Sequence, residues 1–207
     1  MKHLYRYTNL ASAIHLLKTK SLTLLNPATW DDRNDSYFMA EYKRLKKAET
    51  VLALCFAEST ETYHHWRVFS NGADGVRIEM DKEKIVSDFK NLENIKIGNV
   101  EYKRIKDVDQ MKIVDVEKLP FLKRHPYGDE REFRIVYSSP KETIEHKGYS
   151  ISLGWITQIT LSPWMSPALV SSVKDTLKTI DGCSSLKIYQ STLVSNETWK
   201  SLTARVG

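Results

Sequence analysis

The sequence predicts one α+β domain of about six to eight strands that spans residues 1–207. Short apolar or alternating segments typical of strands are interspersed with segments in which apolar residues recur at helical spacing. The predicted elements do not follow the simple order in which each helix connects two parallel strands. No internal repeat, low-complexity tract or Pro/Gly-rich linker divides the 207 residues, which favours a single domain.

The first elements are read from apolar spacing and capping residues. A strand is expected over residues 3–8, and a helix over about residues 9–18, where apolar residues recur every three or four positions. Asn9 or Thr8 supplies the polar side chain that caps this helix. Residues 22–25 form a short apolar strand, which the following Asn-Pro pair ends.

The middle of the chain combines a helix, two strands and one ambiguous segment. A helix is expected to follow the polar loop of residues 31–35 and to reach about Lys47. Residues 51–56 are continuously apolar, which is typical of a strand buried on both faces. Residues 61–70 are expected to be helical or looped, whereas the alternation over residues 76–80 predicts a strand with one wet face.

The second half continues with alternating helices and strands. They are expected over residues 82–92 (helix), 96–103 (strand), 130–137 (strand), 155–161 (strand), 167–179 (helix) and 186–189 (strand), with Asn196 capping a last short helix. Proline at position 167 is favourable because the first helical residue needs no backbone donor. Residues 104–128 show no pattern that assigns them.

Composition indicates a soluble globular protein of the cytoplasm. Hydrophobic residues make up 41% and charged residues 28% of the chain, and no apolar run is long enough to cross a membrane. No signal peptide is recognised. Cys55 and Cys183 form no CxxC pair, so reduced thiols are expected. The net charge of +5 permits contact with nucleic acid or a phosphorylated cofactor without requiring it.

The first candidate for chemistry is the segment of residues 4–8, Leu-Tyr-Arg-Tyr-Thr, which ends a strand and opens a helix. The planar fork of Arg6 suits bidentate binding of a phosphate or ribose group. Thr8 either assists through its hydroxyl group or only caps the helix, and a helix N-terminus favours an anion. The alternative is that Arg6 pairs with a nearby carboxylate for structural reasons.

The second candidate is the Glu-Arg-Glu-Phe-Arg segment of residues 130–134. On a strand, Glu130 and Glu132 face the same side, and Arg134 is the cation on that side. Two neighbouring carboxylates raise the pKa of at least one of them if they are partly buried. The pair could act as a general base or stabilise an oxocarbenium ion, and the alternative is an exposed charge ladder.

Acidic and histidine clusters give weaker indications. Asp31, Asp32 and Asp35 lack the glycine and terminal glutamate of a calcium loop, so turn or helix-capping roles are preferred. A nuclease that uses these aspartates with a glutamate and Mg²⁺ is a third-ranked hypothesis. His64 and His65 are adjacent and diverge, and without a third ligand nearby no metal site is expected.

Trp66 and Phe69, at i and i+3, are interpreted either as core residues or as the lining of a pocket for an aromatic ring. The chain contains no G-x-S-x-G, P-loop or G-x-G-x-x-G motif. This argues against an α/β-hydrolase, a P-loop NTPase and a Rossmann enzyme.

An ordered set of segments resembles a known family. The set comprises residues 4–8, 24–27, 30–32, Asp35, 53–56, Trp66, Phe69, 74–76, Ile78, Phe121, Lys123, 130–134, 159–163 and 191–193. It is similar to the domain-of-unknown-function-2971 family of bacteria and their viruses, over nearly the whole chain. The chain departs from it at residues 31–33, where Asn-Asp-Pro is usual, at Phe69, where tyrosine is usual, and at Phe133, where tryptophan is usual.

A more distant resemblance concerns ADP-ribosyltransferases. Residues 4–8 are similar to the opening strand of these enzymes, where an arginine or histidine and a following threonine or serine hold the nicotinamide ribose. The resemblance implies that Arg6, Tyr7 and Thr8 bind NAD. It also implies the ADP-ribosyltransferase-like fold, a mixed, largely antiparallel split sheet flanked by helices.

Residues 130–132 resemble the catalytic strand of the same enzymes. The resemblance implies that Glu132 is the catalytic carboxylate and that Glu130 orients the acceptor or incoming nucleophile. Lys123 and Arg134 are then expected to bind substrate. Trp66 and Phe69 are the candidates for stacking on the nicotinamide ring.

The function implied by the resemblance is cleavage of NAD and transfer of ADP-ribose to a nucleic acid or protein acceptor, in bacterial or phage conflict. The resemblance implies that NAD is the substrate and that no metal is needed. The expected partners are a nucleic acid or protein acceptor and a cognate antitoxin, and no membrane association is expected. The alternative is a non-catalytic module of the same fold that binds a nucleotide, a nucleic acid or a protein.

Overall fold

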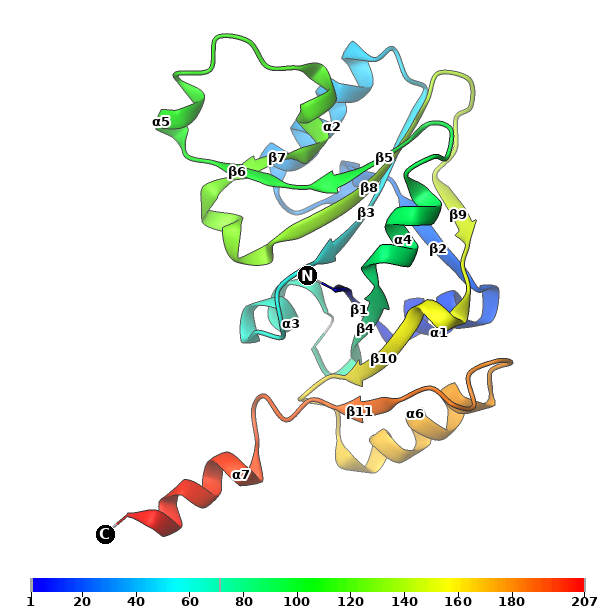
Figure 1. Ribbon diagram of the computed structural model, residues 1–207, viewed down its shortest axis with the longest axis vertical. Coiled ribbons are helices and arrows are strands. Elements are labelled where there is room, and N and C mark those ends of the chain that lie inside the picture. The colour runs from blue at the N-terminus through cyan, green and yellow to red at the C-terminus, as the bar shows by residue number, and fades with distance from the viewer. Residues whose placement is uncertain (1, 71, 207) are drawn as a thin grey trace.

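The computed structural model describes residues 2–70 and 72–206 and is built around one mixed sheet of nine strands (Figure 1). From one edge to the other the order is β11 (Ile188–Gln190), β10 (Ile156–Leu161), β4 (Gly75–Asp81), β1 (His3–Asn9), β3 (Thr50–Ala57), β2 (Ser21–Leu25) and β9 (His146–Ser150), and β8 (Glu132–Ser139) and β5 (Ile95–Asn99) continue from β3. Among these strands only β10 and β11 are parallel.

The sheet is split between β1 and β3. In the described part of the chain these two strands pair at one position alone, Tyr5 opposite Ala57. On its other side β3 pairs with β8 along its whole length, and β1 pairs with β4 from His3 to Asn9. The second half of β1 therefore diverges from β3. This confirms the expected mixed, largely antiparallel split sheet with flanking helices.

Helices cover both faces of the sheet. The α-helices are α1 (Leu10–Thr19), α2 (Arg33–Leu45), α3 (Tyr63–Phe69), α4 (Lys82–Phe89), α5 (Ile105–Val108), α6 (Pro167–Thr179) and α7 (Glu197–Lys200). Helices α1, α4 and α6 pack on one face, whereas α2 packs on the opposite face of β3 and α3 lies against β1 beside the split. Helix α7 leads away from the body of the molecule (Figure 1).

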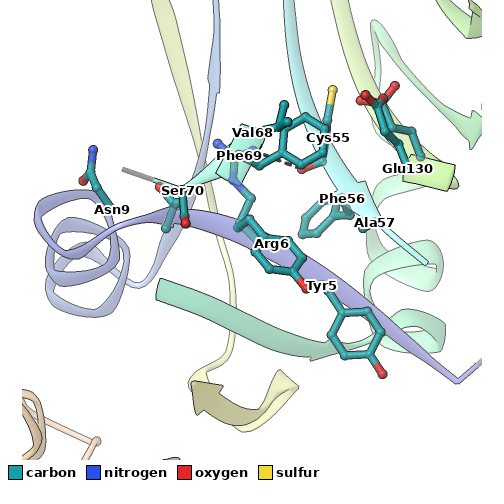
Figure 2. A pocket seen from close by; sticks show the side chains of 13 residues that line it. Tyr5, Arg6, Asn9, Cys55, Phe56, Ala57, Val68, Phe69, Ser70 and Glu130 are labelled. Atoms are coloured by element: carbon teal, nitrogen blue, oxygen red, sulfur yellow. Dashed lines mark hydrogen bonds between the residues drawn. The ribbon is translucent and has the colours of Figure 1, made fainter. Parts of the chain in front are cut away.

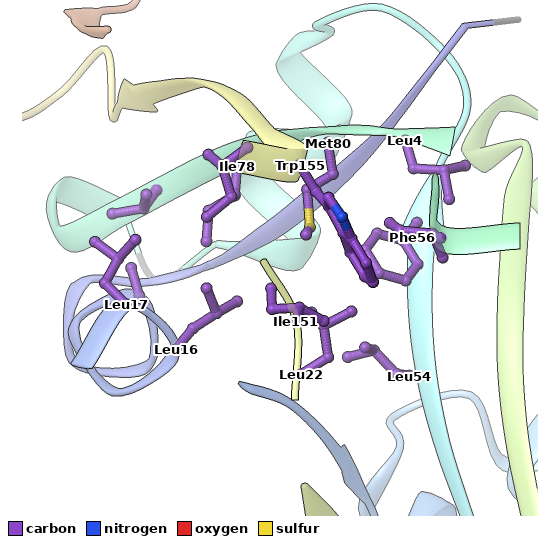
Figure 3. Close-up of a cluster of buried hydrophobic side chains, with 14 of the residues drawn as sticks. Leu4, Leu16, Leu17, Leu22, Leu54, Phe56, Ile78, Met80, Ile151 and Trp155 are labelled. Atoms are coloured by element: carbon purple, nitrogen blue, oxygen red, sulfur yellow. The ribbon is translucent and has the colours of Figure 1, made fainter. Parts of the chain in front are cut away.

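The main core lies between the sheet and helices α1, α4 and α6. Leu54 and Phe56 of β3 point into it together with Ile78 of β4 and Trp155 (Figure 3). The alternate residues of β3 point to the other face, where Ala53 belongs to a second cluster built on α2. Strand β3 is thus buried on both faces, as its continuous apolar run predicts.

Most predicted elements are confirmed, and the differences have local causes. Eleven strands are formed within the described residues rather than six to eight. The strand expected over residues 96–103 consists of β5 and β6 (Glu101–Lys103), and the unassigned segment 104–128 contains α5 and β7 (Leu122–Arg124), which pairs with β6. Strand β9 was missed because its sequence, His-Lys-Gly-Tyr-Ser, has no apolar alternation.

One predicted surface is covered. The face of β4 that was expected to be wet is largely closed, because Arg77 is buried and its Nη2 donates to Thr160 of β10 at 3.2 Å. Cys55 and Cys183 are free thiols, as expected. No helix among residues 2–70 and 72–206 is long and apolar enough to span a membrane.

Candidate functional site

Two cavities meet at the split in the sheet. The first, here called the split cavity, has a volume of about 350 Å³ and is lined by Tyr5, Arg6, Tyr7, Thr8, Asn9, Cys55, Phe56, Ala57, Val68, Phe69, Ser70, Glu130 and Glu132 (Figure 2). The second, here called the Trp30 cavity, has a volume of about 420 Å³ and lies on the side of helix α2. They share a wall made of Arg6, Cys55, Val68, Phe69, Glu130 and Glu132.

Arg6 reaches across the split. It extends from β1 toward β3, where its Nη1 donates a hydrogen bond of 3.0 Å to the carbonyl oxygen of Cys55 (Figure 2). No carboxylate of the described residues forms an ion pair with Arg6, so the structural alternative considered for it is not observed. Burial lowers the pKa of this guanidinium from a very high ordinary value. Its remaining donors are available to an anion in either cavity.

The two glutamates are brought together in a way that differs from the sequence-based prediction. Glu132 begins β8, but Glu130 is the last residue of a 3₁₀-helix (His125–Glu130), so the expectation that both lie on one strand is wrong. The cause is Arg131, whose φ of 45° turns the chain between them. Both carboxylates nevertheless converge on Lys123, whose Nζ lies 2.5 Å from Glu130 and 3.4 Å from Glu132.

Arg134 forms a buried ion pair with Glu132. Its Nη2 lies 2.5 Å from a carboxylate oxygen of Glu132, and both terminal nitrogens donate to Asp35 of α2, at 2.8 and 2.5 Å. Arg134 is 0% exposed and lines neither cavity, which does not favour direct contact with substrate, so its substrate-binding role stays a prediction. It is a positioning residue, whereas Lys123 does line the Trp30 cavity.

Two aspartates of the acidic loop have structural roles at the start of helix α2. Asp32 caps α2 by accepting from the backbone of Asn34 at 3.0 Å. Asp35, expected in a turn or cap, is instead buried against Arg134. These two structural roles give no support to the nuclease hypothesis.

The two glutamates have opposite electrostatic surroundings. Burial raises the pKa of Glu130 to about 7, and the attraction of Lys123 only partly offsets this effect. Burial also acts on Glu132, but Arg134 and Lys123 outweigh it and hold the pKa of Glu132 below its usual value. One carboxyl group therefore titrates near neutrality while its neighbour stays ionised.

The aromatic residues divide between core and cavity. Trp66 is 0% exposed, donates from Nε1 to Glu61 at 2.6 Å and lines neither cavity, which favours the core alternative, and its stacking on nicotinamide stays a prediction. Phe69 lies in the wall between the cavities. Tyr7 and Thr8 line the split cavity, and the buried hydroxyl group of Tyr7 has no partner within the described residues.

His65 packs behind the cavity residue Tyr7 and lines neither cavity itself. It is buried, its Nδ1 lies 2.5 Å from the hydroxyl group of Thr62, and its Nε2 lies 3.1 Å from that of Ser59. Its ring stacks on Tyr7 with centroids 5.3 Å apart. Burial lowers the pKa of His65, which favours a neutral ring. The adjacent histidines were weighed only as metal ligands, and no sequence pattern marks this packing role.

Comparison with solved structures finds DarT of Thermus sp. 2.9. Its complex with NAD+ matches at 11% identity over 92% of this chain and 95% of that chain, with a TM-score of 0.47. Its complex with ADP-ribosylated ssDNA matches at 10% identity over 92% and 94%, also with a TM-score of 0.47. No protein-family model and no curated protein matches the chain, so membership of the domain-of-unknown-function-2971 family stays a prediction. A likeness this distant says nothing about individual site residues.

The strained turn at Arg131 generates a stability prediction. A left-handed backbone costs a residue with a side chain about 1 kcal/mol, and glycine avoids this cost. Since the Arg131 side chain is exposed, Arg131→Gly should stabilise the fold by about that amount in urea unfolding. Arg124→Gly is the matched control, because Arg124 is also exposed but has a φ of −69°. Equal effects of the two variants would contradict the interpretation.

The raised pKa of Glu130 predicts a pH-dependent stability. Between the ordinary value of 4.5 and about 7, the folded protein retains a proton on Glu130 that the unfolded chain has released. This contribution is complete below pH 4.5 and is lost as the pH rises through 7. Relative to Glu130→Gln, the wild type should therefore lose unfolding free energy between pH 5 and 8. A difference that is constant across urea titrations at these pH values would rule out the raised pKa.

Proposed function

We propose that the chain cleaves NAD at the bond between nicotinamide and ribose and transfers ADP-ribose to a nucleic acid or protein acceptor. One observation carries this proposal. Arg6 from β1 and Glu132 from β8 lie on the two sides of the split and line the same cavity. Arg6 has no carboxylate partner among the described residues, and Glu132 is held ionised. A substrate with an anionic part and a bond that breaks to form a cation matches this pair.

Each residue has a defined task in such a reaction. Arg6 and the start of helix α1 bind the phosphates or the ribose of NAD, where Thr8 and Asn9 also line the cavity. Phe69 offers a ring face for nicotinamide. Glu132 stabilises the positive charge that develops on the ribose as the bond breaks, and Arg134 keeps its carboxylate in place and ionised.

A second candidate function is a non-catalytic module that binds a nucleotide, nucleic acid or protein in the same cavities. The observation in its favour is that Lys123 and Arg134 already pair with Glu130 and Glu132. A carboxylate that is neutralised by fixed cations has less capacity to stabilise a further cation. Tight binding of NAD without any release of nicotinamide would favour this module.

Replacement of the proposed catalytic carboxylate tests the reaction. Glu132→Gln should reduce nicotinamide release by about a hundredfold or more, because the amide cannot stabilise the developing positive charge. Glu58→Gln is the matched control: Glu58 is also buried and paired, with Lys82 at 2.5 Å, but lines neither cavity. A folded Glu132→Gln protein with wild-type turnover would refute the proposed role of Glu132.

If Arg6 binds the phosphates or the ribose of NAD, its replacement should weaken the affinity for NAD. Arg6→Lys keeps the positive charge but removes the planar fork, so KM for NAD should rise about tenfold, or about 1.4 kcal/mol, with a smaller change in kcat. Arg44→Lys is the control, because Arg44 is an exposed arginine paired with Glu41 on the surface of α2. If both variants retain the wild-type KM, Arg6 does not bind the substrate.

A further inference from the structure

The Trp30 cavity is a second compartment that opens next to the proposed reactive carboxylates. Besides the wall that it shares with the split cavity, it is lined by residues of the loop before α2 and of the turn before β8, chiefly Trp30, Asp31, Asp32, Lys123 and Tyr127. This part of the lining combines two aromatic rings with carboxylates and one cation, and the shared wall adds Phe69 and Arg6. Because Glu130 and Glu132 belong to both cavities, a group bound here would face a molecule bound in the split.

The two rings are fixed by the same ion network that holds the glutamates. The guanidinium carbon of Arg134 lies 5.0 Å from the centre of the Trp30 ring, and Nζ of Lys123 lies 4.7 Å from that of Tyr127. Contacts of this kind attach a cation to an aromatic face and orient the ring. The cavity thus offers planar surfaces at fixed positions beside the site of bond cleavage.

Asp32 adds an acceptor that the protein does not use. Its Oδ1 caps α2, whereas its Oδ2 is buried and has no hydrogen-bond partner among the residues that the structure describes. A carboxylate oxygen that is shielded from water is stable only when a donor reaches it. In this cavity the donor can come from a bound molecule.

We propose that the Trp30 cavity is the acceptor subsite and binds an unstacked nucleobase that carries an exocyclic amino group, as guanine, cytosine and adenine do. This inference rests on the proposed function. The base stacks on Trp30 and Tyr127, as unpaired bases do on aromatic side chains, and its amino group donates to Asp32. Thymine and uracil lack that amino group.

The net charge of +5 favours a nucleic acid over an arginine-bearing protein, although a guanidinium group also fits the rings and carboxylates of the cavity. Arg33 and Arg124 are exposed and directly follow the cavity residues Asp32 and Lys123. As exposed cations next to cavity residues in the sequence, they are the candidates for contacts with backbone phosphates. In the cavity lining itself carboxylates outnumber cations, which suits an amino donor and keeps the phosphates outside the cavity.

The transfer step balances without a further reagent. The amino nitrogen of the base forms a bond to the ribose carbon that nicotinamide leaves, and nicotinamide departs as a neutral molecule with the electron pair of the broken bond. The amino nitrogen loses one proton, which the carboxylate of Glu130 accepts and returns to water. Glu130 suits this task because it lies between the two cavities.

Single-stranded oligonucleotides test the subsite. All-thymine DNA strands that carry one central guanine, cytosine or adenine are incubated with NAD, and ADP-ribose addition is measured by mass while nicotinamide release is measured separately. Transfer should occur at the amino-bearing bases and be at least tenfold lower on the all-thymine strand. Equal modification of all strands, or modification of an arginine-rich peptide alone, would overturn the proposal.

A conservative variant separates the subsite from helix capping. Asp32→Asn retains an oxygen to cap α2 but replaces the free oxygen with a donor, so the ratio of transfer to nicotinamide release should fall about tenfold. Asp81→Asn is the matched control, since Asp81 caps α4 and lines neither cavity. Tyr127→Phe should keep the ratio and Tyr127→Ala should lower it. An unchanged ratio in Asp32→Asn contradicts the subsite.

The two proposals fail differently. If the wild type releases no nicotinamide, the proposed NAD cleavage is refuted, and equilibrium binding of the same strands then decides about the subsite. A tenfold preference for the guanine strand over the all-thymine strand that is lost in Asp32→Asn supports the subsite, and equal affinities overturn it.

Discussion

The interaction on which the site depends is the buried contact of Arg134 with Asp35 and Glu132. The Arg134 side chain is 0% exposed, so its charge is not stabilised by bulk water. Two carboxylates and the carbonyl oxygen of Pro120 accept hydrogen bonds from it instead. This contact ties helix α2 to strand β8, sets the direction of Glu132 and lies under the ring of Trp30. Loss of Asp35 or Glu132 would leave part of the buried positive charge of Arg134 uncompensated.

The split in the sheet provides the space above this network. Strands β1 and β3 separate beyond Tyr5, and the side chain of Arg6 spans the gap by donating to the carbonyl oxygen of Cys55 in β3, in place of backbone pairing. On the far side, the turn at Arg131 releases Glu130 from β8 and directs it to Lys123. The two cavities therefore meet where the guanidinium group of Arg6 and the carboxylates of Glu130 and Glu132 converge.

Sequence patterns could predict the elements but only part of the site. The apolar run of β3 and the spacing of α1 and α6 depend on local composition, so their positions were predicted correctly. The pairing of Arg134 with Asp35 joins residues 99 positions apart, and no local pattern reports it. The left-handed backbone at Arg131 was equally hidden, because arginine carries none of the signal that glycine gives. Trp66 was ambiguous at helical spacing until its buried bond to Glu61 placed it in the core.

The contrast between Glu130 and Glu132 shows how the same side chain acquires two chemical characters. Both are buried, Glu130 at 2% and Glu132 at 6% exposure. Glu132 contacts Arg134 and Lys123, which hold its pKa below the usual value, whereas burial outweighs the attraction of Lys123 for Glu130 and raises its pKa. A group that stabilises a cation must remain charged, and a group that accepts a proton must be able to release it near neutral pH. Since Lys123 contacts both carboxylates, a shift of this one ammonium group would change both properties together. Because Lys123 lies in the wall of the Trp30 cavity, any molecule bound there would contact a residue that influences the charge of both glutamates.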